Sequence, residues 1–395
     1  MKINKSWLVS VLLICFVETL GHGMVFSLFP VMVLGKSSPF FSSEVSFGMR
    51  GIYLGLVLGA TPLARFCIAS FAGGVSDRFG KQLCVYACLL VGALGYVAAA
   101  ISIKASSFVA LVCSRAVIGA LPVNWIFVSA SVNDYSPADR RGACFSWLVA
   151  ASSIGLVAGF SMGAYLACQG GPEISFAYAA VFVCLCCICA AVLFPSDRRK
   201  QVSSSPSAVC KMGLILCVAH LLFRFGWSSY WDLASAWWMK SFAMESAQVS
   251  GMYAYSSAWK FISSLFLVPL LFTKIPPMRM LKGAMLGLAL LIGALFCVKG
   301  SWILWLILPM QQILFSMIFP AEASLFSSLA VEGHEGSSQG RLQFVESLGA
   351  GLSPFAGGAI LSFGVAAPVL FGGVIIALSY GVLRRFGTSL TASIV

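Results

Sequence analysis

Long apolar runs separated by short polar breaks dominate the sequence. A helix needs roughly 20 apolar residues to cross about 30 Å of hydrocarbon, and the runs are about that long or longer. The pattern therefore predicts an all-α membrane protein with twelve transmembrane helices. The expected spans are 7–33, 50–72, 83–103, 106–131, 143–168, 174–194, 212–238, 249–272, 281–298, 302–329, 342–364 and 366–388.

Composition agrees with this pattern. Of the 395 residues, 59% are hydrophobic and only 10% are charged, and the mean hydropathy is +0.95. Such a chain is not an ordinary water-soluble globule. The net charge of +12 does not indicate nucleic-acid binding, because sixteen of the 25 Lys and Arg fall in alternate loops and termini that share one side. The positive-inside rule then places both termini in the cytoplasm.

The cysteines do not indicate a disulfide framework. Most of the fourteen lie inside the expected spans, where no partner loop is available. Cys184, Cys186, Cys187 and Cys189 are better explained as small apolar side chains of one helix than as metal ligands. We therefore expect no metal and no other cofactor.

A polar, glycine-rich break separates the second run from the third. It reads Gly73-Gly74-Val75-Ser76-Asp77-Arg78-Phe79-Gly80-Lys81, and we expect a tight hairpin at a membrane surface. The pattern resembles the G-x-L-a-D-r-x-G-r/k signature of the major facilitator superfamily of secondary transporters. The resemblance implies a twelve-helix transporter with a gate on its cytoplasmic side. The residues it assigns to that gate are Gly73, Asp77, Arg78, Gly80 and Lys81.

The two halves of the chain repeat. A shift of 198 residues places Pro122 on Pro320 and Asn124 on Glu322. Such repeats support two pseudo-symmetric six-helix halves about an axis normal to the membrane, with substrate bound between them at mid-depth. A charged, Ser- and Pro-containing stretch suits a linker between the halves. The expected units are an N-terminal half over 1–194, a cytoplasmic linker over 195–211 and a C-terminal half over 212–395.

Glu18 lies inside the first expected span. A charge near the bilayer centre costs at least about 2.5–3.5 kcal/mol, so it needs a partner, water or a task. The residues around it, with Pro30 following, resemble helix one of the drug/proton antiporter branch, which includes the tetracycline exporters. Glu18 and Arg224 each follow a basic residue by 13 positions, which predicts similar depth. We expect them to form an ion pair that breaks as the halves rock, or else a static pair that fixes the packing.

Two further cations lie inside spans. Arg115 and Gly119 resemble the R-x-x-x-G motif of the family, which implies a role in proton coupling for Arg115; a purely structural arginine that bonds carbonyl groups is the alternative. Lys260 lies about eleven residues into the eighth span. At that depth snorkelling to the surface is difficult, so we expect Lys260 to contact substrate.

Other ionisable residues also lie in the expected spans. Glu322 is expected to contact substrate, because it occupies the position of Asn124 in the first half, whereas Glu346 is expected to pair near the surface. Arg65 is as well suited to an interfacial or gate role as to substrate contact. His22 and His220 are more often packing residues than proton relays in such positions.

Aromatic residues follow Arg224 along the seventh span. Trp227 and Trp231 lie one and two turns beyond it, so all three share a helix face. A cation beside aromatic surface suits an amphipathic ligand with an anionic or polar end. A packing stripe is the alternative.

The fifth span carries Gly155, Gly159 and Gly163 at four-residue spacing, a pattern that allows close helix packing. It resembles the exporter motif G-x-x-x-G-P-x-x-G, except that Phe160 replaces the proline. Close helix packing through the three glycines is therefore still expected, but without the proline the motif gives less support for export.

Together these patterns predict a transporter rather than an enzyme. We expect a secondary active transporter in the cytoplasmic membrane, working by alternating access as a monomer, with proton-coupled efflux of a small molecule. At mid-depth in the membrane the cations Arg115, Arg224 and Lys260 outnumber the expected carboxylates. An importer or exchanger of an anionic metabolite is therefore the first alternative. A non-transporting sensor or assembly factor is the second, although idle intramembrane charges are costly.

Overall fold

The computed structural model describes residues 5–35, 38–42, 44–125, 127–128, 132, 136, 141–193, 211–298, 300–328 and 335–386. In the first half the elements are α1 (Lys5–Phe26), α2 (Leu28–Leu34), α3 (Phe47–Phe79), α4 (Lys81–Lys104), α5 (Phe108–Ile118), η1 (Leu121–Val123), α7 (Arg141–Gly170) and α8 (Pro172–Leu193). In the second half they are α9 (Lys211–Trp231), α10 (Ala234–Ser241), α11 (Ser246–Ile262), η3 (Ser263–Leu267), α12 (Val268–Phe272), α13 (Pro277–Leu295), η4 (Ser301–Ile303), α14 (Leu304–Ser328), α15 (Glu335–Ile360), η5 (Leu361–Phe363) and α16 (Ala367–Phe386).

The helices match the twelve apolar runs. Within the described residues, ten helical segments are long and apolar enough to cross a membrane. The short apolar α5 and the broken pair α9–α10 occupy the two remaining runs. The all-α, twelve-span prediction is therefore confirmed, with breaks that hydropathy alone did not indicate.

One boundary prediction was wrong. We expected a hairpin over the polar break that starts at Gly73, but α3 continues through this stretch to Phe79. Polar residues can remain helical beyond the hydrocarbon, so polarity did not end the helix. Gly80 ends it, with a φ of 89° that side-chain-bearing residues rarely adopt, and α4 begins at the next residue. The side chains of the predicted gate residues Asp77, Arg78 and Lys81 lie outside the described part of the structure.

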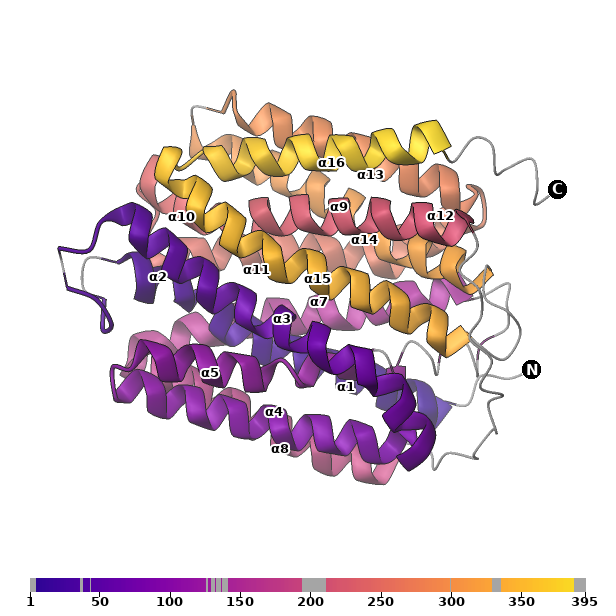
Figure 1. The fold of residues 1–395 in the computed structure, drawn as a ribbon, viewed down its shortest axis with the longest axis horizontal. Coiled ribbons are helices and arrows are strands. Elements are labelled where there is room, and N and C mark those ends of the chain that lie inside the picture. The colour runs from indigo at the N-terminus through magenta and orange to yellow at the C-terminus, as the bar shows by residue number, and fades with distance from the viewer. Residues whose placement is uncertain are drawn as a thin grey trace.

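The helices run roughly side by side along the long axis of the molecule (Figure 1). We call the end where α1 begins and α16 ends the terminal end, and the end near α2 the opposite end. In the first half α1 packs on α7 and α8, and α4 packs on α5 and α8. In the second half α9 packs on α15 and α16, and α13 packs on α14 and α16. The halves meet where α3 contacts α15 and where α7 contacts α11 and α14.

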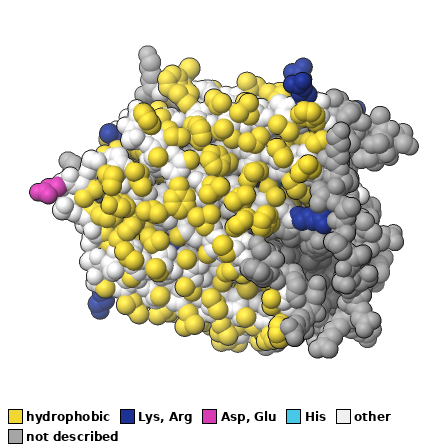
Figure 2. Space-filling model, viewed as in Figure 1, with side chains coloured by type: hydrophobic (Ala, Val, Ile, Leu, Met, Phe, Trp, Pro, Cys, Tyr) yellow, Lys and Arg dark blue, Asp and Glu magenta, His cyan; other side chains and the backbone are white. Residues whose placement is uncertain are grey.

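The outer surface suits a lipid environment. Figure 2 shows that hydrophobic side chains cover the middle of the face in view, while the charged side chains drawn there lie toward its two ends. This distribution matches a hydrocarbon layer bounded by headgroups on both sides. The polar side chains of the membrane-spanning segments must therefore be sought inside the bundle.

Glycines allow two pairs of helices to touch backbone to backbone. On α7, a Cβ added at Gly155, Gly159 or Gly163 would meet the carbonyl oxygens of Phe16, Leu20 and Met24 on α1, respectively. Between the halves, Gly55 of α3 faces the carbonyl of Pro354 on α15 in the same way. Such contacts are typical of membrane helices, whose association depends on close packing.

We predict that Gly159→Val destabilises the protein by about 1–3 kcal/mol, because the added carbons would push α7 away from α1. The measurement is thermal unfolding of the purified protein in detergent. Gly381→Val on α16 is the matched control, since a Cβ there meets no atom within 4 Å. Equal unfolding temperatures for the two variants would contradict the prediction.

Candidate functional site

A cavity of about 300 Å³ lies between the two halves. Helices of both halves line it: α1, α3, α4, α5 and α7 from the first, and α9, α11, α14 and α15 from the second. Its charged lining residues are Glu18, Arg65, Arg224, Asp232, Lys260, Glu322 and Glu346. Among the described residues, no group of three His, Cys, Asp or Glu side chains could hold a metal ion.

Aromatic contacts between the halves flank the cavity on the side of the opposite end. Tyr253 of α11 makes an edge contact with Phe26 of α1, with ring centroids 5.4 Å apart. It also stacks on Phe160 of α7 at 5.2 Å. We call Phe26, Phe160 and Tyr253 the opposite-end closure. Phe160, where the exporter motif has proline, thus contributes its ring to a contact that proline could not make.

A second set of aromatic contacts lies toward the terminal end. Phe319 of α14 contacts Trp125 at 5.2 Å and Phe145 of α7 at 6.1 Å. We call these three residues the terminal-end closure. Phe145 and Phe160 are 15 residues apart on α7, or about 22 Å along a helix axis. The cavity therefore lies between two cross-half contacts.

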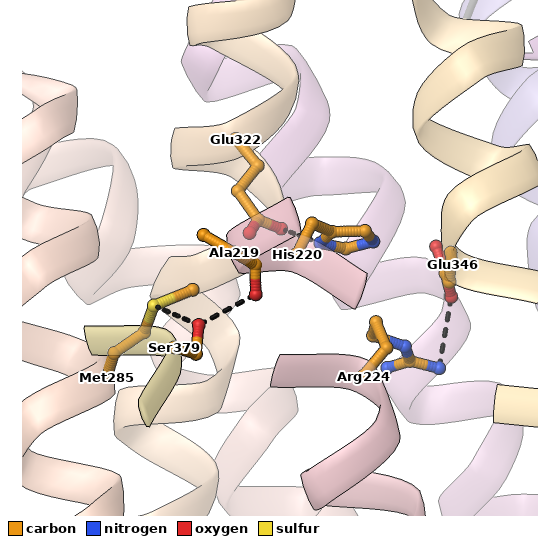
Figure 3. A network of polar contacts seen from close by, with 7 residues as sticks. All are labelled: Ala219, His220, Arg224, Met285, Glu322, Glu346 and Ser379. Carbon is orange, nitrogen blue, oxygen red and sulfur yellow. Dashed lines mark hydrogen bonds and ion pairs between the residues drawn. The ribbon is translucent and has the colours of Figure 1, made fainter. Parts of the chain in front are cut away.

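One ion pair and one histidine–carboxylate contact tie α9 to its neighbours in the second half (Figure 3). His220 Nδ1 lies 2.7 Å from Glu322 Oε2 on α14, and both side chains are buried. One turn further along α9, an Arg224 guanidinium nitrogen lies 3.1 Å from Glu346 Oε1 on α15. Nearby, the Ser379 hydroxyl donates to the Ala219 carbonyl at 2.7 Å, which ties α16 to the same helix.

The expected ion pair between Glu18 and Arg224 is not formed, because Arg224 is paired with Glu346. The expectation that Glu346 lies near the surface was also wrong. The apolar span that α15 and η5 form runs over Arg341–Phe363, close to the expected one. Glu346 is not a surface residue because its side chain faces inward, where it lines the cavity and pairs with Arg224.

Two carboxylates of the cavity have no ion-pair partner among the described residues: Glu18 on α1 and Asp232 between α9 and α10. Arg65 of α3 interacts electrostatically with Glu18 and Glu346 beyond ion-pair distance. Arg65 was expected either to serve an interfacial or gate role or to contact substrate. Its position in the cavity wall favours substrate contact.

Arg115 lies behind the cavity wall and not in it. Its guanidinium carbon is 4.6 Å from the centre of the Phe29 ring, and its Nε donates to the Val57 carbonyl at 3.4 Å. The Thr61 hydroxyl donates to the Arg115 carbonyl at 2.9 Å. This burial among rings and carbonyl groups favours the structural alternative, and a coupling role for Arg115 stays a prediction.

The predicted face of α9 does line the cavity. Trp227 stacks on Trp231 with centroids 5.4 Å apart and on Phe315 of α14 at 4.3 Å. Lys260 of α11 lies over the same Phe315 ring, with Nζ 4.8 Å from its centre. We call Trp231, Trp227 and Phe315 the aromatic stack.

Asp232 is the principal residue that sequence reasoning missed. It interrupts the apolar run 212–238, so the signal that identified Glu18 was also present here. With Asp232 included, four carboxylates of the cavity face three permanent cations, Arg65, Arg224 and Lys260. The expected basic excess at mid-depth is therefore absent from the described cavity lining.

Comparisons with known proteins agree with this architecture. A family model described as Major Facilitator Superfamily matches residues 10–210. The quinolone resistance protein NorA of Staphylococcus aureus is 22% identical over 364 residues, which cover 90% of this chain and 89% of that protein. The class H tetracycline resistance protein of Pasteurella multocida is 22% identical over 198 residues, covering 50% of this chain and 46% of that protein.

Solved structures show the same fold. The human organic anion transporter MFSD10 (TETRAN) superposes with a TM-score of 0.80 at 17% identity, covering 97% of this chain and all of that one. The proton:xylose symporter XylE, bound to 6-bromo-6-deoxy-D-glucose, has a TM-score of 0.76 at 13% identity and covers 97% of this chain and 96% of that one. At these identities the likeness concerns the fold alone.

We predict that Arg224→Met and Glu346→Gln are energetically coupled. Their double-mutant cycle should give an interaction energy of about 0.5–3 kcal/mol, because each variant removes the same ion pair. The measurement is denaturant unfolding in detergent micelles. The control cycle pairs Arg224→Met with Glu18→Gln and should be additive within about 0.5 kcal/mol. Coupling in the control cycle and none in the first would restore the pair expected from sequence.

Proposed function

Because the chain belongs to the major facilitator superfamily, a family of membrane transporters and not of enzymes, we propose that it exports an amphipathic small molecule in exchange for protons. The proposal places it as a monomer in the cytoplasmic membrane. The positive-inside rule orients both termini toward the cytoplasm, so the terminal end would be the cytoplasmic end.

The proposal of proton coupling rests on the position of Glu18. It is a buried carboxylate in a cavity inside the membrane-spanning bundle, and it has no ion-pair partner among the described residues. Apart from the histidines, the other charged lining residues balance, since Asp232, Glu322 and Glu346 face Arg65, Arg224 and Lys260. A proton on Glu18 removes the one carboxylate in excess, and an unpaired charge inside a membrane is costly. Protonation of Glu18 is therefore the change that makes the cavity easiest to close.

Alternating access requires that contacts at the two ends of the cavity open in turn. The opposite-end closure and the terminal-end closure each join rings of the first half to a ring of the second. Rocking of the halves would separate one set of rings at a time. The arrangement with both closures formed is the intermediate that such a cycle passes through.

The relatives support export and an aromatic substrate. Two of them are named for resistance to quinolones and to tetracycline, and a membrane transporter confers resistance by removing the compound from the cell. The aromatic stack offers rings against which a flat compound can pack. The alternative of anionic-metabolite import rested on a basic cavity, and the four carboxylates among its charged lining residues remove that support.

We predict that Glu18→Gln reduces substrate-driven proton movement at least about tenfold. The amide keeps the size and polarity of the side chain but cannot carry the proton. The measurement uses proteoliposomes with an enclosed pH-sensitive dye and an imposed proton gradient, challenged with cationic, neutral and anionic compounds.

Glu44→Gln is the control, because Glu44 is exposed in the segment before α3 and should be neutral in this assay. Unfolding temperature should be retained in both variants. Undiminished proton movement in Glu18→Gln would contradict coupling through this residue. Movement with anions alone would favour the importer, and no transport of any compound would favour the sensor.

A further inference from the structure

Two of the cavity's charged residues without an ion-pair partner, Lys260 and Asp232, adjoin opposite ends of the aromatic stack. At one end, Lys260 lies over Phe315. At the other end, Asp232 directly follows Trp231 in the chain, at the joint between α9 and α10. The stack between them consists of nearly parallel rings, with interplanar angles of 22° between Phe315 and Trp227 and 16° between Trp227 and Trp231.

Neither end has an ion-pair partner among the described residues. No carboxylate lies within ion-pair distance of Lys260, and no cation lies within that distance of Asp232. At longer range Glu346 attracts Lys260, and Arg224 attracts Asp232, but Glu346 and Arg224 are paired with each other. Arg115 also attracts Asp232, whose carboxylate interacts with the Ser228 hydroxyl. A charge in a partly desolvated site favours an oppositely charged partner, and here the ligand must supply it.

The cavity wall also contains buried hydrogen-bond donors. The buried amides of Gln312 and Gln343 line the cavity, and their Nε2 atoms have no hydrogen-bond partner among the described residues. Gln312 lies on α14, one turn before Phe315, the ring that Lys260 covers. An unpaired buried donor is stabilised by an acceptor oxygen of a ligand.

We infer that the cavity binds zwitterionic compounds in which a flat aromatic body separates an amine from a carboxylate. Asp232 would bind the amine, Lys260 would bind the carboxylate, and the aromatic stack would pack against the rings. The inference rests on the proposed function for its transport cycle, but it concerns ligand binding and is tested by binding alone.

The test uses three probes of one scaffold: a piperazinyl quinolone, which is a zwitterion, its methyl ester, which keeps only the positive charge, and its N-acetyl derivative, which keeps only the negative charge. Binding of each to the purified protein in lipid nanodiscs is measured by equilibrium titration. The zwitterion should bind about tenfold or more tightly than either derivative, because each lacks one charge-assisted hydrogen bond.

Two variants assign the charges to residues. Lys260→Met should weaken binding of the zwitterion and the N-acetyl derivative about tenfold and leave the ester unchanged. Asp232→Asn should weaken binding of the zwitterion and the ester by a similar factor and leave the N-acetyl derivative unchanged. Lys260→Arg should retain binding within about threefold, which separates loss of charge from misfolding. Lys104→Met, at an exposed position ending α4, should change nothing.

The inference is overturned if the ester binds as tightly as the zwitterion, or if Lys260→Met weakens all three probes equally. It is also overturned if the zwitterion fails to bind the unaltered protein. Failure of proton exchange in proteoliposomes, with this binding pattern intact, would remove the proposed coupling and leave the inference standing.

Discussion

The cost of placing charge inside a membrane determines how this bundle is built. Arg224 and His220 lie one turn apart on α9, and each reaches a carboxylate of a different neighbour, Glu346 on α15 and Glu322 on α14. These pairs join three cavity-lining helices of the second half. In the first half Glu18 has no such partner among the described residues, so two halves of similar topology hold their charges differently. The second half is therefore internally cross-linked by contacts that the first half lacks at Glu18.

Packing between the helices complements this asymmetry. Glycines let α7 lie directly on the backbone of α1, which fixes two helices of the first half to each other. Between the halves, Gly51 and Gly55 of α3 meet the backbone of Gly358 and Pro354 of α15, and the Phe66 and Phe344 rings of the same two helices lie 4.4 Å apart. Close packing within a half allows that half to move as a unit when the two halves rock.

Hydropathy alone was sufficient to predict the spans, because every apolar run must cross the same thickness of hydrocarbon. It could not predict where helices end. The stretch before Gly80 is polar yet helical, and α15 begins at Glu335, six residues before its apolar part. The apolar pattern also did not show that Glu346 faces the cavity. The partner of Arg224 also escaped prediction, since it depends on how α9 and α15 are rotated toward each other. Asp232, in contrast, could have been found from its place in an apolar run.

The joint between α9 and α10 connects the ligand-binding residue Asp232 with the opposite-end closure. Tyr253 belongs to the opposite-end closure, and its hydroxyl donates to the Trp231 carbonyl at 3.1 Å. Trp231 also makes an edge contact with the Tyr253 ring at 5.1 Å, and Asp232 is the next residue in the chain. A ligand amine that binds Asp232 therefore acts on the backbone segment that holds the closure ring in place. The segment Trp231–Asp232 thus contacts both the ligand and the closure residue Tyr253. A shift of this segment is the most direct way for a bound ligand to open or close the opposite end of the cavity.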